Sequence, residues 1–268
     1  MSQTMLIDDS IPGFYRDPLV TAECRPFTMR RGGKASVLFL HGFTGSPADF
    51  RRFAALYHDQ GYDVFTPLMP GHGSHVSQLE RLSYRELAIP FPPVYQYLRT
   101  HYQAVHLCAL SYGCVPAVEL ALADQPKTLC FLAPAFQLTR EQEQKIAWAK
   151  RIHLQKFRGR VSKSQIRSGF NQDPDPTTYD AVGIRAALEL HQRAEELRGE
   201  LKNLGVPVFH AHGDLDQTTP AGSNRAILSE VVTNYTFYGI REAGHVLPTE
   251  PGNEDLAKTH IAWMREQD

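Results

Sequence analysis

Short apolar runs alternate with amphipathic runs of helical periodicity along most of this chain. The apolar runs have the length of strands, and several are apolar at successive positions, which is typical of strands buried on both faces of a sheet. We expect strands at residues 36–41, 63–66, 104–110, 128–132, 206–212 and 235–239. The alternation predicts an α/β fold with a doubly wound, mostly parallel sheet covered by helices on both faces.

Proline and capping residues mark the expected helices between these strands. A helix over 47–60 begins at Pro47, which suits the first helical position, after Ser46 as its cap. The helical run 83–102 must break near Ile89, because the prolines that follow lack the amide N–H that a continuous helix needs. We expect further helices over 112–123, 183–201, 220–231 and 253–264.

Composition restricts the class of protein. With 268 residues, 42% of them hydrophobic, the chain can bury the core of one α/β domain that carries a modest insertion. The 28 Lys and Arg nearly balance the 29 Asp and Glu, which gives no case for a nucleic-acid partner. No apolar run is long enough to span a bilayer, and the first residues do not resemble a signal peptide. We therefore expect a cytoplasmic protein without stable membrane insertion, and the pattern specifies no oligomeric state.

The alternation stops between residues 136 and 179. A long insertion after a central strand is typical of a cap over a site at the carboxyl ends of the strands, so we predict a helical cap at 136–179 and a core at 1–135 and 180–268. Between 140 and 167 the segment has nine Lys or Arg against two acids, which indicates either a ligand-facing surface or a solvated face. Its helix, expected from Glu141 to Phe157, carries an apolar stripe that either lines an acyl pocket or packs the cap onto the core: Ile146, Ala149 and Ile152, with Trp148 beside it.

Ser111 lies where the strand 104–110 meets the helix 112–123. Small residues on both sides allow a sharp strand-to-helix turn that projects the hydroxyl away from the sheet. The helix that follows directs its free N–H groups toward the place where an oxyanion would form. The pattern indicates a nucleophile, although a helix-capping serine would give the same short motif.

An activated serine needs a histidine base and an acid that orients the base. In doubly wound hydrolases, the acid and then the histidine follow the serine in the chain, each in a loop after a later strand. Asp216 follows the strand 206–212, and His245 follows the strand 235–239, so both belong to the sheet edge at which Ser111 emerges. We predict a Ser111–Asp216–His245 triad.

Two residues compete with this assignment. Asp214 is the rival acid, but Asp216 lies a full turn beyond the strand and can reach back over its end. His260 is the rival base, but it falls on the last helix, where we expect it at the surface. For the oxyanion hole we expect two backbone donors, the amides of Tyr112 after the nucleophile and of Phe43 in the first strand-to-helix loop.

Other histidines could suggest a metal. His210 and His212 project to one face of a strand, and His72 and His75 lie in a loop near the expected site. No third ligand follows at a suitable spacing, and the cysteine spacing fits neither a zinc site nor a disulfide framework. We predict no metal and no cofactor, and expect these histidines to pack or to support the site.

Four segments of this chain closely resemble the bacterial carboxylesterases and monoacylglycerol lipases of the α/β-hydrolase family: 37–50, 70–73, 110–113 and 244–246. The resemblance runs from about residue 36 to the end, apart from the cap. It implies the Ser111–Asp216–His245 triad, oxyanion donors at Phe43 and Tyr112, and hydrolysis of carboxylic esters. The chain departs from the family pattern at Ala109 and Cys114, where glycine is usual, and in its broken helix at 90–93.

We therefore expect a serine hydrolase that cleaves small-molecule esters, with short to medium acyl chains or monoacylglycerols, through an acyl-enzyme. Serine at the turn excludes the aspartate nucleophile of dehalogenases and epoxide hydrolases. The same triad would also serve thioester, amide or carbon–carbon bond hydrolysis. A ligand-binding relative that retains the pocket as a sensor is the alternative from another class.

Overall fold

A computed structural model describes residues 11–14, 17–156, 159–163 and 177–267 of the chain. Seven strands form one sheet in the order β1-β3-β2-β4-β5-β8-β9. All neighbouring pairs are parallel except β1, which lies antiparallel to β3 at one edge. The strands of this sheet are β1 Phe27–Met29, β2 Ala35–Leu40, β3 Asp63–Thr66, β4 Ala104–Leu110, β5 Thr128–Leu132, β8 Val208–Gly213 and β9 Tyr235–Ile240.

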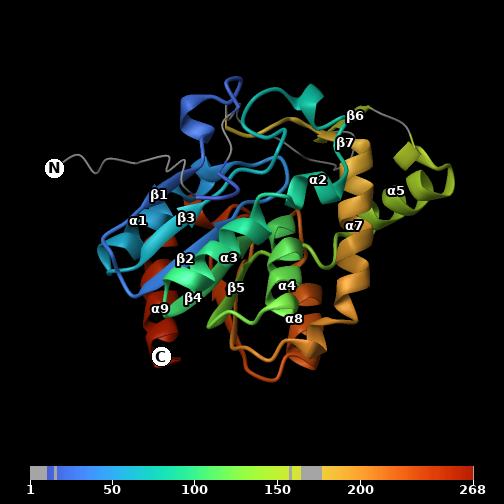
Figure 1. Ribbon diagram of the computed structural model, residues 1–268. Helices are drawn as coiled ribbons and strands as arrows, with labels where there is room; N and C mark the ends of the chain where they lie inside the picture. Colours follow the sequence, from blue (N-terminus) through green and yellow to red (C-terminus); the bar gives the residue numbers. More distant parts are fainter. Residues whose placement is uncertain (1–10, 15–16, 157–158, 164–176, 268) are drawn as a thin grey trace.

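Helices cover both faces of the sheet (Figure 1). Helices α1 and α9 contact each other on one face, and α3, α4 and α7 pack on the other. The predicted α/β fold with a mostly parallel sheet is thus confirmed. Within the described residues, the α-helices are α1 Arg51–Asp59, α2 Tyr84–Ala88, α3 Phe91–His101, α4 Cys114–Ala123, α5 Arg140–Arg151, α7 Ile184–Arg198, α8 Ala221–Val231 and α9 Asn253–Glu266.

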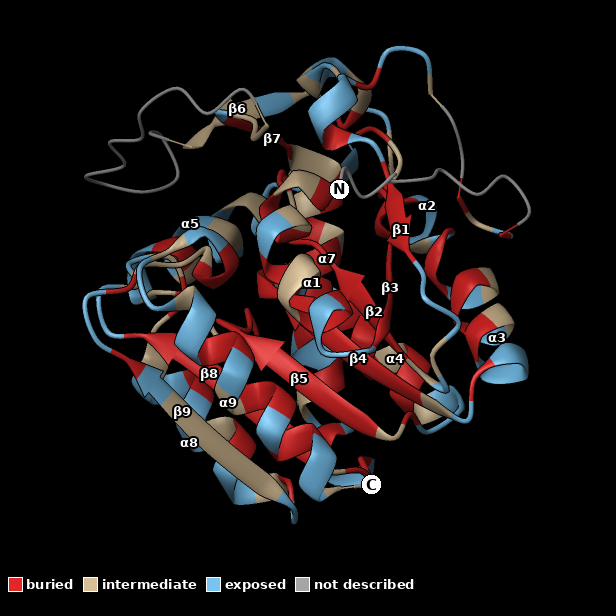
Figure 2. Ribbon diagram, turned by 90° about the vertical axis from the view of Figure 1, so that its left-hand side faces the viewer, coloured by how far each residue is buried: buried red, intermediate tan, exposed pale blue. Residues whose placement is uncertain are grey.

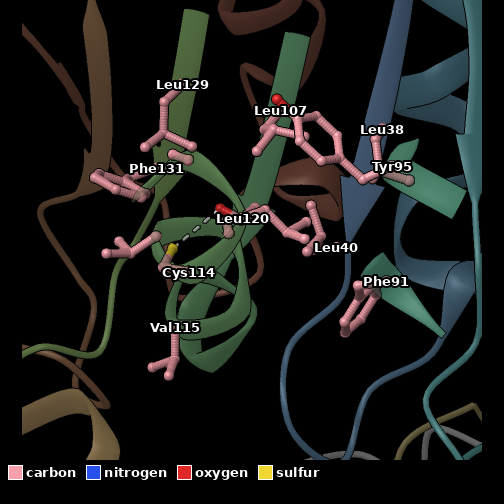
Figure 3. Close-up of a cluster of buried hydrophobic side chains, with 14 of the residues drawn as sticks. Leu38, Leu40, Phe91, Tyr95, Leu107, Cys114, Val115, Leu120, Leu129 and Phe131 are labelled. Atoms are coloured by element: carbon pink, nitrogen blue, oxygen red, sulfur yellow. Dashed lines mark hydrogen bonds between the residues drawn. The ribbon is translucent and has the colours of Figure 1, made fainter. Parts of the chain in front are cut away.

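The central strands are buried on both faces, as the burial colours of Figure 2 show. Successive residues of β2 point to opposite sides, so Leu38 enters the core under α3 and α4 while Phe39 enters the core under α1 and α9. Figure 3 shows the first of these cores, where the Cys114 thiol at the start of α4 lies 3.3 Å from the carbonyl oxygen of Ala109 on β4. The two apolar cores explain why the strands lack a polar alternation.

The segment predicted as a helical cap is not wholly helical. Helix α5 ends at Arg151, earlier than the expected Phe157, because a single turn (Leu154–Lys156) and then strand β6 (Arg160–Ser162) follow it. Strand β6 pairs antiparallel with β7 (Ala181–Gly183), which lies just after the predicted segment, so the two form a two-stranded sheet. The end of the expected helix and residues 164–176 lie outside the described residues, and the division of the chain into core and cap stays a prediction.

The predicted break in the helical run 83–102 is confirmed, because α2 ends at Ala88 and α3 begins at Phe91.

The expectation that His260 lies at the surface is wrong. Its side chain is fully buried on α9, and its Nδ1 lies 2.7 Å from the hydroxyl of Tyr57 on α1. The amphipathic pattern of a terminal helix did not reveal that this histidine faces the sheet. Among the described residues, no helix combines the length and apolarity needed to cross a bilayer.

Buried histidines should make stability depend on pH. Burial lowers the pKa of His41 to about 4, and of His72 and His260 to about 3. The histidines of the unfolded chain bind protons below about pH 6.5, whereas the buried rings of the folded chain do not. The folded state therefore keeps its full stability above that pH and loses stability as the pH falls toward 4. We expect the free energy of unfolding, from denaturant titrations, to decrease between pH 7.5 and 5. Below about pH 6.5, each of these histidines should contribute up to about 1.4 kcal/mol of this loss per pH unit.

Two substitutions separate this effect from a general response to acid. His260→Gln should lower stability at pH 7.5 but make its pH dependence shallower, because one buried titrating ring is lost. His101→Gln, at an exposed position at the end of α3, should leave the slope unchanged. An unfolding free energy that stays level from pH 7.5 to 5 would contradict the prediction.

Candidate active site

Ser111 follows the last residue of β4 and has a left-handed backbone, with φ of 54°. This conformation is costly for a residue with a side chain and persists only where the surrounding structure imposes it. A single 3₁₀ turn, Ser111–Gly113, leads directly into α4. The strand, the strained residue and the helix together form the sharp turn that the sequence predicted, and they bring the serine hydroxyl to the carboxyl edge of the sheet.

Close packing behind the turn explains its glycine. A methyl group at Gly113 would lie 2.6 Å from the carbonyl oxygen of His41 and would also contact that of Leu40. The backbone of Gly113 itself is helical, with φ of −61°, so the requirement is for space rather than for an unusual conformation. The turn Ser111–Gly113, which we call the elbow, is therefore pressed against the end of β2.

His245 joins Ser111 to Asp216. Its Nε2 lies 2.8 Å from the Ser111 hydroxyl oxygen, and its Nδ1 lies 2.7 Å from Oδ2 of Asp216. A carboxylate only accepts hydrogen bonds, so Nδ1 carries the proton and Nε2 is left to accept the serine proton. The three residues come from the loops after β4, β8 and β9, and the arrangement can activate a serine for nucleophilic attack.

Asp216 is held as a buried carboxylate. The amides of Thr218 and Thr219 donate to its Oδ1 at 2.7 and 3.0 Å, and the Thr219 hydroxyl donates to Oδ2 at 2.9 Å. Burial acts to raise the pKa of this side chain, but the charge and hydrogen bonds of His245, His212 and the Thr219 amide outweigh it and lower the pKa. The carboxylate therefore stays ionised beside His245.

The structure separates Asp216 from its rival. Asp214 is exposed, and its Oδ1 accepts a hydrogen bond of 2.8 Å from the amide of Glu242. The other rival, His260, is in the core under α1. Neither residue takes part in the contacts between His245 and Ser111, so only the favoured set is brought together.

The loop after β2 lies against the nucleophile. A methyl group at Gly42 would lie 3.3 Å from Cβ of Ser111, and Phe43 follows directly. Tyr112 lies in the turn after the serine, so the two expected oxyanion donors belong to segments on either side of Ser111. Their role as donors stays a prediction.

Two neutral histidines fix this loop. The sequence led us to expect a packing or supporting role for His72, but it indicated none for His41. His72 accepts a hydrogen bond from the Thr44 amide at its Nε2, 3.0 Å away, and its Nδ1 donates to the Pro70 carbonyl. His41 accepts from the Met69 amide in the same way, at 3.0 Å. Burial keeps both rings unprotonated, which accepting an amide proton requires. One sequence signal could have indicated these roles. A histidine stands directly before a glycine after β2 (His41) and again after the neighbouring strand β3 (His72).

Among the described residues, two groups of side chains have the composition of metal ligands. Glu143, His191 and Glu195 lie within reach of one ion, but Lys150 Nζ is 2.6 Å from Glu195, and Arg198 is 3.9 Å from Glu143. These cations already neutralise the carboxylates.

The second group comprises Cys108, Cys130 and His260 and is buried in the core. Burial raises the pKa of the Cys130 thiol and so favours the protonated form, whereas a metal binds the thiolate. Neither group supports a resident metal, and none of these atoms contacts Ser111 or His245.

Comparison with known proteins agrees with this fold. Residues 37–259 match the model of the alpha/beta hydrolase family. The chain belongs to the α/β-hydrolase family.

Among known proteins, a thermostable monoacylglycerol lipase of Bacillus sp. (strain H-257) is 24% identical over 228 residues, covering 85% of this chain and 88% of that protein. A carboxylesterase of Bacillus subtilis (strain 168) is 25% identical over 228 residues, covering 83% and 89% of the two chains. The chain is thus a distant homologue of both.

Solved structures show the same fold. The chain superposes on a structure from a study of the metagenome-derived lipolytic enzymes LipS and LipT with a TM-score of 0.79, at 18% identity and with 92% of this chain and 99% of that chain covered. It also matches the monoacylglycerol lipase of Paleococcus ferrophilus with a TM-score of 0.74, at 17% identity and with 91% and 100% covered.

The close packing at the elbow gives a direct test with a matched control. Gly113→Ala should lower the free energy of unfolding by about 1–3 kcal/mol, because the added methyl group meets two carbonyl oxygens. Gly222→Ala in the first turn of α8 adds the same group where no atom lies within 4 Å, so stability should hold or rise by up to about 1 kcal/mol. Denaturant titrations of the two variants would reject the packing argument if Gly113→Ala were as stable as Gly222→Ala.

Proposed function

We propose that this protein is a serine hydrolase that cleaves carboxylic esters through an acyl-enzyme. The observation that carries the proposal is the continuous line of contacts from Ser111 through His245 to Asp216, with distances of 2.8 and 2.7 Å. The distant homologues named as a monoacylglycerol lipase and a carboxylesterase support ester substrates. We propose esters of short to medium acyl chains, monoacylglycerols among them, as the substrate class.

The residues present supply each step of the reaction. His245 Nε2 takes the proton of Ser111 as the serine oxygen attacks the ester carbonyl, and Asp216 stabilises the imidazolium that forms. The amides of Phe43 and Tyr112 would hold the oxyanion. When the intermediate collapses, the carbon–oxygen bond to the alcohol breaks and His245 returns the proton to the alcohol. Water, activated by the same histidine, then releases the acid and restores Ser111.

The acyl pocket is not assigned to either of two surface hollows formed by described residues. One hollow of about 930 Å³ lies between α2, α3, α4 and α7, and another of about 740 Å³ lies between α5 and α8; neither is lined by a triad residue. On α5, Trp148 is 61% exposed and Ile152 is 42% exposed, while Ile146 and Ala149 are half-buried. Ile152, the exposed member of the predicted stripe, does not pack on the core, so lining a substrate path remains the proposal for it.

The nucleophile can be tested by covalent labelling. Ser111→Ala should abolish labelling by a fluorophosphonate probe and hydrolysis of p-nitrophenyl and glyceryl esters, because the attacking oxygen is lost. The melting temperature should stay close to that of the wild type, since the substitution removes one hydroxyl. Labelling or turnover that persists in Ser111→Ala would overturn the assignment.

The wild-type protein separates the alternatives. Labelling together with ester turnover supports the proposal, and labelling with turnover of thioesters or amides alone would redirect it to those substrates. A wild-type protein that does not label would favour the ligand-binding alternative.

The two neighbouring aspartates give a matched pair for the acid. Asp216→Asn should lower kcat by about 10³-fold or more, because an amide in that place no longer holds the required tautomer of His245. Asp214→Asn makes the same chemical change on an exposed carboxylate and should retain most of the activity. Equal losses in the two variants, measured on one ester, would contradict the triad.

A further inference from the structure

Three side chains continue the line of hydrogen bonds beyond Asp216, away from Ser111. His210 and His212 lie two residues apart on β8 and so share one face of the sheet, and Tyr235 begins the neighbouring strand β9. Tyr235 Oη is 2.7 Å from His210 Nδ1, and His210 Nε2 is 3.0 Å from His212 Nδ1. His212 Nε2 is 3.1 Å from Asp216 Oδ2. The proposed mechanism assigns no role to these three residues.

The surroundings of His212 determine which ring nitrogen carries its proton. Its Nε2 faces the carboxylate of Asp216 and, at 3.0 Å, the backbone carbonyl of Thr219. Both oxygens only accept, so Nε2 must be the donor. In a neutral ring Nδ1 is then an acceptor, and His210 must donate to it from its own Nε2. His210 Nδ1 accepts in turn, from the hydroxyl of Tyr235. All three donors therefore point toward Asp216.

A neutral state of both rings is needed for this order. The two histidines are almost fully buried, at 0% and 1% exposed. Burial lowers the pKa of His210 well below its ordinary value, and the neighbouring His212 and the Arg225 guanidinium act in the same direction. Arg225 is the cation that α8 places on this side, 4.4 Å above the ring of Phe237 on β9. A second proton on His212, at Nδ1, would face the Nε2–H of His210 and break that bond of the line. A second proton on His210, at Nδ1, would turn the Tyr235 hydroxyl from donor to acceptor and change the order.

We propose that His212 is a positioning residue for Asp216, and that the hydrogen bonds from Tyr235 to His210 and from His210 to His212 stabilise the tautomer in which His212 donates to Asp216. The inference rests on the proposed function. His212 and the Thr219 hydroxyl donate to Oδ2, the oxygen that binds His245, and so fix the plane of the carboxylate. His212 contacts no reacting atom, so it acts through the direction in which Asp216 holds His245.

Nitrogen-15 NMR of the histidine-labelled wild-type protein tests the tautomers without reference to activity. At neutral pH, His210 and His212 should each show a protonated Nε2 and an unprotonated Nδ1. The His212→Gln variant assigns the His212 signals. Observing the opposite tautomer or an imidazolium at either residue would overturn the proposal.

Kinetics test the positioning role. His212→Leu removes the donor and should lower kcat by about 10-fold, as expected for one hydrogen bond to a charged group, with KM within about twofold. His212→Gln carries an amide nitrogen at the position of Nε2 and should recover most of kcat. An unchanged kcat in His212→Leu would refute the role. So would a loss that Gln does not restore in a folded variant.

The tyrosines of β9 provide a matched pair. Tyr235→Phe removes the hydroxyl that donates to His210 Nδ1, so the nitrogen-15 signal of that Nδ1 should shift, while kcat falls by less than it does in His212→Leu. Tyr238→Phe makes the same change on a ring that stacks on Phe209, in the other core, and should alter neither measurement. An unchanged His210 Nδ1 signal in Tyr235→Phe would show that the hydroxyl does not donate to this ring.

The outcomes distinguish this inference from the proposed function. If the wild type fails to label at Ser111, the hydrolase proposal fails, and the NMR result still decides the order of the tautomers. If Ser111 labels but His212→Leu keeps full activity, only the positioning role fails.

Discussion

Parallel pairing is the constraint on which the site depends. In a parallel sheet every strand runs in the same direction, so the loops after β2, β4, β8 and β9 all emerge at one edge. Ser111, Asp216 and His245 are separated by many residues in the chain but come from three of these loops, and Phe43 comes from the fourth. The sheet can hold this arrangement because apolar cores cover both of its faces, and strands packed on two sides have little freedom to shift.

Strain at the nucleophile is balanced by close support from its neighbours. Ser111 has a positive φ. On one side of it, Gly113 packs against the end of β2. On the other side, the loop after β2 is fixed by the hydrogen bond from the Thr44 amide to His72. Buried neutral histidines suit this task, because one ring can accept from a backbone amide and donate to a carbonyl at the same time. The same property lets His210 and His212 form a line of hydrogen bonds that runs from Asp216 along β8. Histidine therefore serves this protein more often as a neutral structural connector than as a base.

The insertion between β5 and α7 is tied close to the elbow. His191 on α7 lies 3.1 Å from Glu143 on α5, and its other ring nitrogen lies 3.4 Å from the hydroxyl of Tyr112, the residue after the nucleophile. Lys150 of α5 also pairs with Glu195 of α7, at 2.6 Å. These polar contacts connect the insertion to the residue that we expect to bind the oxyanion.

The sequence by itself determined the fold class, the order of the strands along the chain and the residues of the candidate triad, because strand length, apolar runs and the serine turn are local signals. It did not reveal the edge strand β1 or the pairing of β6 with β7, since strands of three residues are too short to show a periodicity. It preferred Asp216 to Asp214, but only the structure shows Asp216 beside His245 and Asp214 engaged with the amide of Glu242. It also placed His260 at the surface, although the ring faces Tyr57 in the core. Side-chain partners depend on which segments meet in space, and that was decided by tertiary packing alone.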